Sequence, residues 1–151
     1  MVVLDFPPPA FRIRTQQRHE QIFDALRRRW VRLTPEEWVR QNVLQYVIKV
    51  LQYPAALIGV EKEIMVGGLR KRVDILVFDR NHQPWMLIEC KAPAIALTDA
   101  VLHQAIRYHR AAPASYLVIT NGAQTRAWEK KHQSLQEMET LPPYPTASER
   151  L

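Results

Sequence analysis

Two acidic residues and one lysine near the centre of the chain are the groups best suited to chemistry. Asp74 lies in the apolar run RVDILVF, and Glu89 and Lys91 lie in the apolar run WMLIECK. If residues 79–84 form a tight connection and the two runs pair as antiparallel strands, Asp74 lies directly opposite Glu89 on one face. Lys91 then points the same way and Cys90 points to the other side, because side chains alternate along a strand.

Opposed carboxylates on such apolar strands predict a bound cation. Each carboxylate should raise the pKa of the other, and Lys91 should offset this repulsion only in part. Mg²⁺, with Mn²⁺ as a substitute, binds oxygen ligands at roughly 2.0–2.1 Å. Asp74, Glu89 and the backbone carbonyl of Cys90 would supply such oxygens. The metal would activate a water molecule for hydrolysis, and Lys91 would orient that water or counter the developing negative charge.

A structural ion cluster is the alternative explanation of Asp74, Glu89 and Lys91, because an E-x-K tripeptide is common and structural networks also gather charges. Other chemistries lack the residues they need. The five histidines never pair with the single cysteine at the spacing of a zinc site. The sequence has no phosphate-binding glycine loop and no serine-nucleophile elbow.

Capping signals and apolar patterns predict the elements that position these groups. The segment Thr34-Pro35-Glu36-Glu37 combines a capping residue, a proline in the first turn and a glutamate three residues after the cap. It predicts a helix from Pro35 to about Gln52. After it we expect strands at 57–66, 72–78 and 85–91, a helix at 98–110, and strands at 116–120 and 125–129. This order predicts an α/β fold with a central mixed sheet flanked by helices.

The chain is expected to have three parts. Residues 1–33 form an amino-terminal extension with a hairpin between Phe11 and Phe23, and residues 34–132 form the core. Residues 133–151 form a tail that is poorly ordered from Leu141 onward. No apolar run approaches the roughly 20 residues that a membrane span needs. Together with the lone cysteine, this predicts a cytoplasmic protein without membrane contact.

The basic excess predicts a polyanionic partner. The formal net charge is +6, and lysine and arginine displace condensed counterions from nucleic-acid phosphates. Basic side chains gather before the first helix and before the second strand. We expect the following residues to contact DNA phosphates: Arg27, Arg28, Arg29, Arg32, Arg70 and Lys71. A solvated basic surface is the alternative.

Three further residues have two explanations each. Glu37 is better explained as the capping-box partner of Thr34 than as a metal ligand, because local capping accounts for it completely. Gln104 and Tyr108 lie one turn apart on one face of the second helix. Packing explains these two residues as often as contact with a substrate.

The residues described so far resemble the PD-(D/E)XK nucleases, and more narrowly the amino-terminal nuclease domain of type I restriction enzyme R subunits. The resemblance rests on Asp74 followed by the tripeptide ECK at 89–91. It rests further on the stretches TPEEWVRQ, LIECKAP, HQAIRYH and YLVITNG, in this order. It extends over about residues 22–122. The combination of these stretches is more specific than the D…ExK pattern alone.

The resemblance implies a restriction-endonuclease-like core of α-β-β-β-α-β order and Mg²⁺-dependent hydrolysis of DNA phosphodiester bonds. It implies that Asp74 and Glu89 bind the metal and that Lys91 assists the attack. Glu37 is similar to an extra acidic residue that many relatives place near the metal. The QAIRY segment from Gln104 to Tyr108 resembles a Q-x-x-x-Y motif that helps to orient the active site or the DNA.

Two departures from the family pattern accompany the resemblance. Val73 replaces the proline of the named motif, a change that touches no metal ligand. R subunits carry an ATP-driven motor after the nuclease domain, and the printed chain holds no such motif, so we expect no use of ATP. The implied partners are DNA and other subunits of a restriction or repair assembly.

Three interpretations result from the sequence. The leading one is a metal-dependent endonuclease acting on DNA. The second is a catalytically weak or inactive DNA-binding or assembly module of the same fold. The third is a structural protein whose acidic cluster is only an ion network. Retention of Asp74, Glu89 and Lys91 argues against the second, and the TPEEW and ECKAP matches argue against the third.

Overall fold

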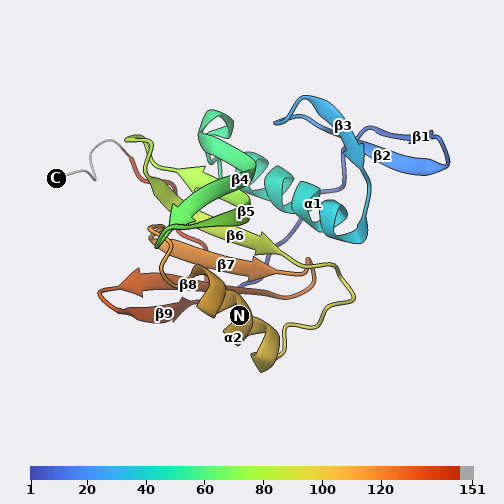
Figure 1. The fold of residues 1–151 in the computed structure, drawn as a ribbon. Coiled ribbons are helices and arrows are strands. Elements are labelled where there is room, and N and C mark those ends of the chain that lie inside the picture. Colours follow the sequence, from blue (N-terminus) through green and yellow to red (C-terminus); the bar gives the residue numbers. More distant parts are fainter. Residues whose placement is uncertain (147–151) are drawn as a thin grey trace.

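The computed structural model describes residues 1–146, which form two sheets and two α-helices (Figure 1). The larger sheet has the strand order β4-β5-β6-β7-β8-β9. Its strands are β4 (Ile58–Val66), β5 (Leu69–Phe78), β6 (Pro84–Cys90), β7 (Tyr116–Thr120), β8 (Thr125–Lys131) and β9 (Ser134–Met138). Strands β6 and β7 run parallel, and the other neighbours run antiparallel. The predicted α/β class with a mixed sheet is therefore confirmed.

Helix α1 (Pro35–Lys49) begins where the capping motif predicts. The Oγ1 of Thr34 accepts the backbone N–H of Glu37 at 3.0 Å. Pro35 occupies the first turn, where its missing N–H has no helical partner to lose. The helix ends at Lys49 rather than near Gln52, because Gln52 has a φ of 60°, outside the helical region.

Two helices cover opposite faces of the large sheet (Figure 1). Val43 of α1 belongs to one cluster of buried residues with Ile75 of β5. Leu102 of the second helix, α2 (Asp99–His109), belongs to another cluster with Leu76 of the same strand. Successive residues of β5 therefore pack into different layers, which explains why this strand is apolar on both faces.

A second, three-stranded sheet projects from the body beside α1, and we call it the arm (Figure 1). It consists of β1 (Ile13–Gln16), β2 (His19–Asp24) and β3 (Arg29–Arg32), all antiparallel. The predicted amino-terminal hairpin is confirmed as β1 and β2. Its two turn residues, Gln17 and Arg18, have φ values of 52° and 67°, as the tightest hairpin turns require. The third strand of the arm was not predicted.

The carboxyl-terminal region packs on the body instead of forming a poorly ordered tail. Strand β9 pairs with β8, and Leu141 and Tyr144 pack against the core. The hydroxyl of Tyr144 donates a hydrogen bond to the carbonyl of Phe78 at 2.9 Å. The prediction of poorly ordered chain is therefore wrong for residues 141–146. Residues 147–151 of the predicted tail lie outside the described residues.

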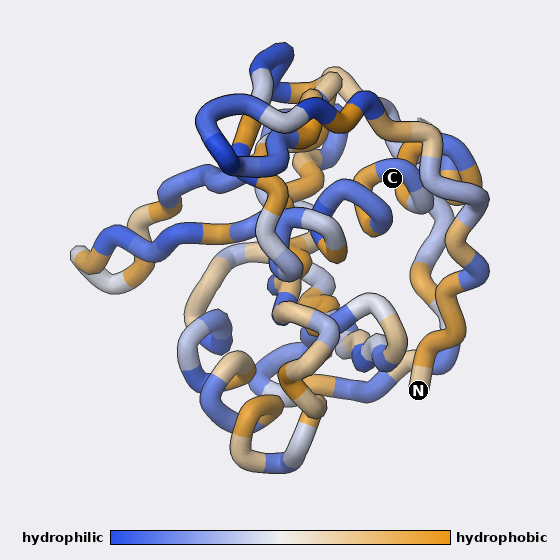
Figure 2. Tube along the Cα trace, turned by 90° about the vertical axis from the view of Figure 1, so that its right-hand side faces the viewer, coloured by the Kyte–Doolittle hydropathy of each residue, from blue (hydrophilic) through white to orange (hydrophobic). Residues whose placement is uncertain are grey.

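Hydrophilic and hydrophobic residues alternate at short intervals along the chain (Figure 2). This pattern is typical of strands and helices that each bury one face and expose another. Neither α1 nor α2, the two α-helices of residues 1–146, is long and apolar enough to cross a membrane.

Candidate active site

Strands β5 and β6 bring the two predicted carboxylates to the same end of the sheet. They pair antiparallel with Ile75 opposite Ile88. The pairing from Ile75 to Val77 is the one that the sequence predicts, although a register shift between Val77 and Phe78 places Phe78 opposite Pro84 instead of Trp85. Asp74 precedes Ile75 and Glu89 follows Ile88, so the two acidic residues lie one step beyond the last paired residues. The Oδ2 of Asp74 accepts the backbone N–H of Cys90 at 2.7 Å. The Asp74 carboxylate is thus held on the backbone of β6, next to Glu89.

The surroundings of Asp74 offset its negative charge only in part. Its side chain is 20% exposed, and burial raises its pKa above the ordinary value of an aspartate. The hydrogen bond from Cys90 and the charge of Arg40 lower the pKa, while the charge of Glu89 raises it further. The Nη1 of Arg40 lies 3.4 Å from Asp74 Oδ1. Because the net pKa is raised, a nearby cation would stabilise the ionised carboxylate.

Glu89 shows the opposite shift. Burial alone would raise the pKa of Glu89, but the hydrogen bond to His109 and the charge of Lys91 hold it below its ordinary value. His109 is buried, and its Nε2 lies 3.2 Å from Glu89 Oε1. We expected each carboxylate to raise the pKa of the other. The pKa of Asp74 is raised, but the prediction is wrong for Glu89, because the hydrogen bond to His109 lowers its pKa. The sequence analysis did not place His109 in the site.

One oxygen of Glu89 is left for another ligand. Among the described residues, the buried Oε2 of Glu89 makes no hydrogen bond. The Nζ of Lys91 lies 3.6 Å away, which is an ion pair but is too long for a hydrogen bond. A buried polar atom without a partner is costly and often marks the position of an ion. Oε2 is therefore the atom of this site most in need of a cation.

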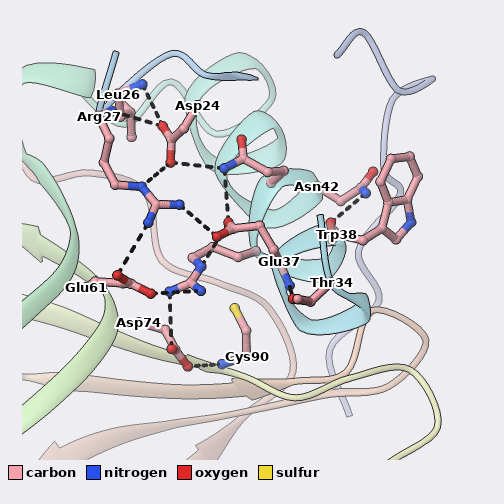
Figure 3. A network of polar contacts seen from close by, with 12 residues as sticks. Asp24, Leu26, Arg27, Thr34, Glu37, Trp38, Asn42, Glu61, Asp74 and Cys90 are labelled. Atoms are coloured by element: carbon pink, nitrogen blue, oxygen red, sulfur yellow. Dashed lines mark hydrogen bonds and ion pairs between the residues drawn. The ribbon is translucent and has the colours of Figure 1, made fainter. Parts of the chain in front are cut away.

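An ion network connects Asp74 to α1 and to the base of the arm (Figure 3). Arg27 pairs with Asp24 at 2.6 Å and with Glu37 at 2.8 Å. Arg40 pairs with the same Glu37 at 3.1 Å and with Asp74 at 3.4 Å. The network therefore runs without a gap from the end of β2, through α1, to the carboxylate pair.

Glu37 reaches the carboxylate pair only through an arginine. Its Oε1 accepts from Arg27 and its Oε2 accepts from Arg40. The neighbouring Glu36 is largely exposed, and partial burial of its carboxyl group, followed by the charge of Asp74, raises its pKa. The charge of Asp74 thus acts on Glu36, although the sequence analysis singled out Glu37. Adjacent helical residues point about 100° apart, so the two glutamates face different surroundings.

Helix α2 supports β5 through Tyr108. The hydroxyl of Tyr108 accepts the backbone N–H of Arg72 at 3.4 Å. The Nζ of Lys71 donates to the backbone carbonyl of Tyr108 and lies 4.8 Å from the centre of its ring. Gln104, one turn earlier, is exposed and lines a surface hollow with Tyr108. Tyr108 thus fixes the part of β5 that leads into Asp74.

The basic residues expected to contact phosphates lie in two kinds of surroundings. The side chain of Arg27 is only 12% exposed, and its guanidinium group is paired with the carboxylates of Asp24 and Glu37. Lys71 is engaged by Tyr108. The exposed members of the set are Arg28, Arg29, Arg32 and Arg70. Lys71 is partly exposed, and Arg70 pairs with Glu63 at 3.9 Å.

The donor set of the site fits Mg²⁺ better than a softer metal. Residues 1–146 contain no group of three or more His, Cys, Asp or Glu side chains that could hold a metal ion. Mg²⁺ keeps several waters and is held by one or two carboxylates. Asp74, Glu89 and the Cys90 carbonyl match that pattern, and burial raises the pKa of the Cys90 thiol and disfavours a thiolate ligand.

Replacing Arg27 by methionine is expected to lower the free energy of unfolding by about 3–5 kcal/mol, because it leaves buried carboxylates without their cation. Burial alone would raise the pKa of Asp24, but hydrogen bonds from Arg27 hold it below its ordinary value. The stability that Asp24 gains from Arg27 is therefore fully present above the pKa of Asp24 in the unfolded chain. It is lost as the pH falls through the lower pKa of Asp24 in the folded protein. Urea unfolding at neutral pH measures the effect. The exposed Arg28→Met is the control and should stay within about 0.5 kcal/mol of the wild type; equal losses would contradict the network's role.

The structure thus describes an α/β protein in which two carboxylates from neighbouring strands meet a lysine at the end of a mixed sheet. The family described as type I restriction enzyme R protein N terminus matches residues 35–142. This segment runs from the first residue of α1 past the end of β9 and includes Asp74, Glu89 and Lys91. The chain belongs to this family. A search of curated proteins found no match to the chain.

Proposed function

We propose that this chain is a metal-dependent endonuclease that hydrolyses phosphodiester bonds of DNA. One observation carries the proposal. Asp74 binds the backbone N–H of Cys90, next to Glu89, and Lys91 lies 3.6 Å from a Glu89 oxygen that has no hydrogen-bond partner among the described residues. Membership in a restriction-enzyme family supports DNA as the substrate and other subunits of a restriction assembly as partners.

The order of elements supports a core of the PD-(D/E)XK type. Helix α1 precedes the three antiparallel strands β4, β5 and β6, and α2 connects β6 to the parallel strand β7. This is the α-β-β-β-α-β order expected for that core. The carboxylates lie at the end of the central strands, between the two helical layers. Asp74 contacts Arg40 of α1, and Glu89 contacts His109 of α2.

Each residue of the site has a separate task in this proposal. Asp74, Glu89 and the Cys90 carbonyl would hold Mg²⁺, or Mn²⁺ in its place. When bound, the metal supplies Lewis-acid activation of a water molecule and of the phosphoryl group. Arg40 and the Cys90 N–H fix the position of Asp74. His109 fixes Oε1 of Glu89 and leaves Oε2 for the metal.

Lys91 is the residue proposed to assist the attack. Its side chain is 34% exposed, so water and phosphate can reach the ammonium group. It would orient the attacking water or counter the charge of the transition state. Glu36 is the acidic residue of α1 that we place next to the metal, while Glu37 acts one step away by holding Arg40.

The DNA would lie across the end of the sheet and the neighbouring basic groups. Gln104 and Tyr108 would support the active site or face the DNA from α2. Arg28, Arg32, Arg70 and Lys71 would contact phosphates without reading the sequence. Arg27, whose carboxylate partners hold it in place, would act through the ion network.

Nicking of supercoiled plasmid DNA tests the proposal. The reaction should proceed with Mg²⁺ or Mn²⁺, stop with EDTA and require no ATP. A parallel gel-shift measurement shows whether the protein binds the same DNA. Binding without cleavage under every metal would favour an inactive binding or assembly module. Neither binding nor cleavage would leave the acidic pair as a structural ion cluster.

Mg²⁺ is expected to raise the melting temperature of the wild type and not that of Asp74→Asn. A free concentration ten times the dissociation constant adds about 1.4 kcal/mol, or about 3–6 °C for a chain of this size. Burial raises the pKa of Asp74, so its charge costs stability once the pH exceeds that pKa. Metal-free Asp74→Asn should therefore melt at or above the wild-type temperature at neutral pH. Indifference of the wild type to millimolar Mg²⁺ and Mn²⁺ would argue against a metal site.

A further inference from the structure

One face of the arm carries arginines and aromatic rings side by side. Opposed residues in neighbouring strands share a face, as do residues two apart in one strand. The register places Phe23 opposite Trp30, and it places Gln21 between Arg14 and Arg32. The carbonyl of Arg12 accepts the N–H of Phe23, so Arg12 joins the same set. We call this set the arginine face; its cationic and aromatic members are Arg12, Arg14, Phe23, Trp30 and Arg32.

Two of the arginines are held in place by the aromatic rings. The guanidinium of Arg14 lies 4.2 Å from the centre of the Trp30 ring, and that of Arg12 lies 4.9 Å from the Phe23 ring. The two rings contact each other edge to face at 5.5 Å. Arg14 also donates its Nε to Gln21 at 2.8 Å, a bond that does not use its two terminal amino groups. Stacked guanidinium groups lose little further freedom when they bind a ligand.

The positive charge of the arginine face is not offset by acidic groups. Among residues 1–146, the side chains of Arg12, Arg14 and Arg32 form no ion pair with a carboxylate, and all three are exposed. Glu20 shares the opposite face of the arm with the buried Ile22. Asp24, the last residue of β2, is engaged by Arg27. The face is therefore suited to a polyanion.

The ion network fixes the arm relative to the candidate active site. Asp24 at the end of β2 binds Arg27, and Glu37 of α1 lies between Arg27 and Arg40. Arg40 in turn contacts Asp74. Figure 3 shows this path from the base of the arm to Asp74. A ligand held on the arm is thus held at a set distance from the site.

We infer that the arginine face binds backbone phosphates of DNA and holds the DNA for cleavage at Asp74 and Glu89. This inference rests on the proposed function, which makes DNA the polyanion the chain handles. Guanidinium groups bind phosphate oxygens through paired N–H donors and carry no sequence information in such contacts. The arm lies outside the segment that the family match covers, residues 35–142. It is a second contact surface, separate from the groups that would act on the phosphodiester bond.

The test compares the wild type with Arg12→Gln/Arg14→Gln in the full chain. Fluorescence anisotropy measures binding to labelled duplexes of two unrelated sequences in EDTA, over a range of salt concentrations. Loss of two phosphate contacts should reduce the slope of log K against log salt by about 1.8, and equally for both sequences. The single variants Arg12→Gln and Arg14→Gln should each reduce it by about 0.9. Loss of an exposed cation–π contact costs little stability, so the variants should stay folded and the melting temperature should fall by only a few degrees.

Arg80 offers a matched control. It is exposed in the turn that follows β5, and its guanidinium lies 5.2 Å from the Tyr144 ring. Arg80→Gln should keep the wild-type slope. An unchanged slope in the double variant would overturn the inference, even if the wild type cleaves DNA. A reduced slope in a wild-type protein that never cleaves would support the arm as a binding surface and overturn the proposed function alone. Equal displacement of the DNA by poly-glutamate would assign the face to an acidic protein instead.

Discussion

Replacing Lys91 by alanine is expected to lower the single-turnover rate of DNA cleavage about a hundredfold or more, the usual scale for a lost proton-transfer or charge-stabilising group. The Nζ of Lys91 lies 3.6 Å from Glu89 Oε2, the oxygen proposed to bind the metal. DNA affinity should change little, because one ammonium is a small part of a chain with a net charge of +6. Binding of Mg²⁺ should be at least as tight as in the wild type, since a positive neighbour is removed.

The chain contains a matched control for this change. Glu129-Lys130-Lys131 is a second E-x-K tripeptide, in β8, and Lys131 Nζ lies 3.8 Å from Glu129 Oε2. The residues opposite Glu129 are Tyr116 and Gln136, so no aspartate opposes it. Lys131→Ala should therefore cleave at the wild-type rate. A Lys91→Ala protein that cleaves as fast as its parent would remove Lys91 from the mechanism.

Replacing His109 by alanine is expected to weaken Mg²⁺ binding and cleavage about 10–100-fold, the scale seen when a group that orients a metal ligand is lost. His109 is 2% exposed, and its Nε2 lies 3.2 Å from Glu89 Oε1. Without it, nothing described in the structure holds that oxygen, and Glu89 can turn away from Asp74. His109 acts through Glu89, so it is a positioning residue.

His109→Gln separates this role from simple packing. The glutamine amide can donate to Glu89 in place of the imidazole, so it should restore most of the affinity for Mg²⁺. Metal titrations should be read beside melting temperatures for both variants. If the alanine and glutamine variants lose stability but bind Mg²⁺ as the wild type does, His109 only fills the core.

Strong local signals made the central elements predictable from the sequence. Thr34 and Pro35 mark the start of α1, because capping is decided within a few residues. The apolar runs of β5 and β6 are bounded by polar turn residues, and the length of the connection predicts that Ile75 pairs with Ile88. The observed pairing agrees at Ile75, but Phe78 lies opposite Pro84, and the register shift between Val77 and Phe78 was not predicted. These features depend on neighbours in sequence and not on the rest of the fold.

Elements with half-exposed, polar sequences were missed. Strand β9 (SLQEM) lies at the edge of the large sheet with an alternating, mostly exposed pattern, and β3 (RWVR) has four residues. Such strands form because a neighbouring strand offers backbone partners. The packing of Leu141 and Tyr144 likewise depends on a core surface built from distant segments. The proline-rich composition from Leu141 onward predicted a poorly ordered segment.

The candidate site was predicted only where its residues lie in the paired strands. Asp74, Glu89 and Lys91 follow from register and alternation. His109 and Arg40 reach the pair from the two helices, across 20 and 34 residues of sequence. A helix pattern does not reveal which strand residue its side chains will meet. The TPEE motif contains both Glu36 and Glu37, and the capping box singled out Glu37. The influence of the Asp74 charge on Glu36 depends on how α1 packs on the sheet, which the motif does not reveal.

The most direct test of a catalytic site at Asp74 and Glu89 is the rate of plasmid nicking by Glu89→Gln, measured in Mg²⁺ beside Glu129→Gln. Both substitutions remove one carboxylate from an E-x-K tripeptide, so they change the net charge equally. Only Glu89 faces an aspartate and carries the buried oxygen without a hydrogen-bond partner among the described residues. Glu89→Gln should nick DNA no faster than wild type in EDTA, and Glu129→Gln should nick it at the wild-type rate in Mg²⁺. Equal nicking by the two variants would contradict the proposed site.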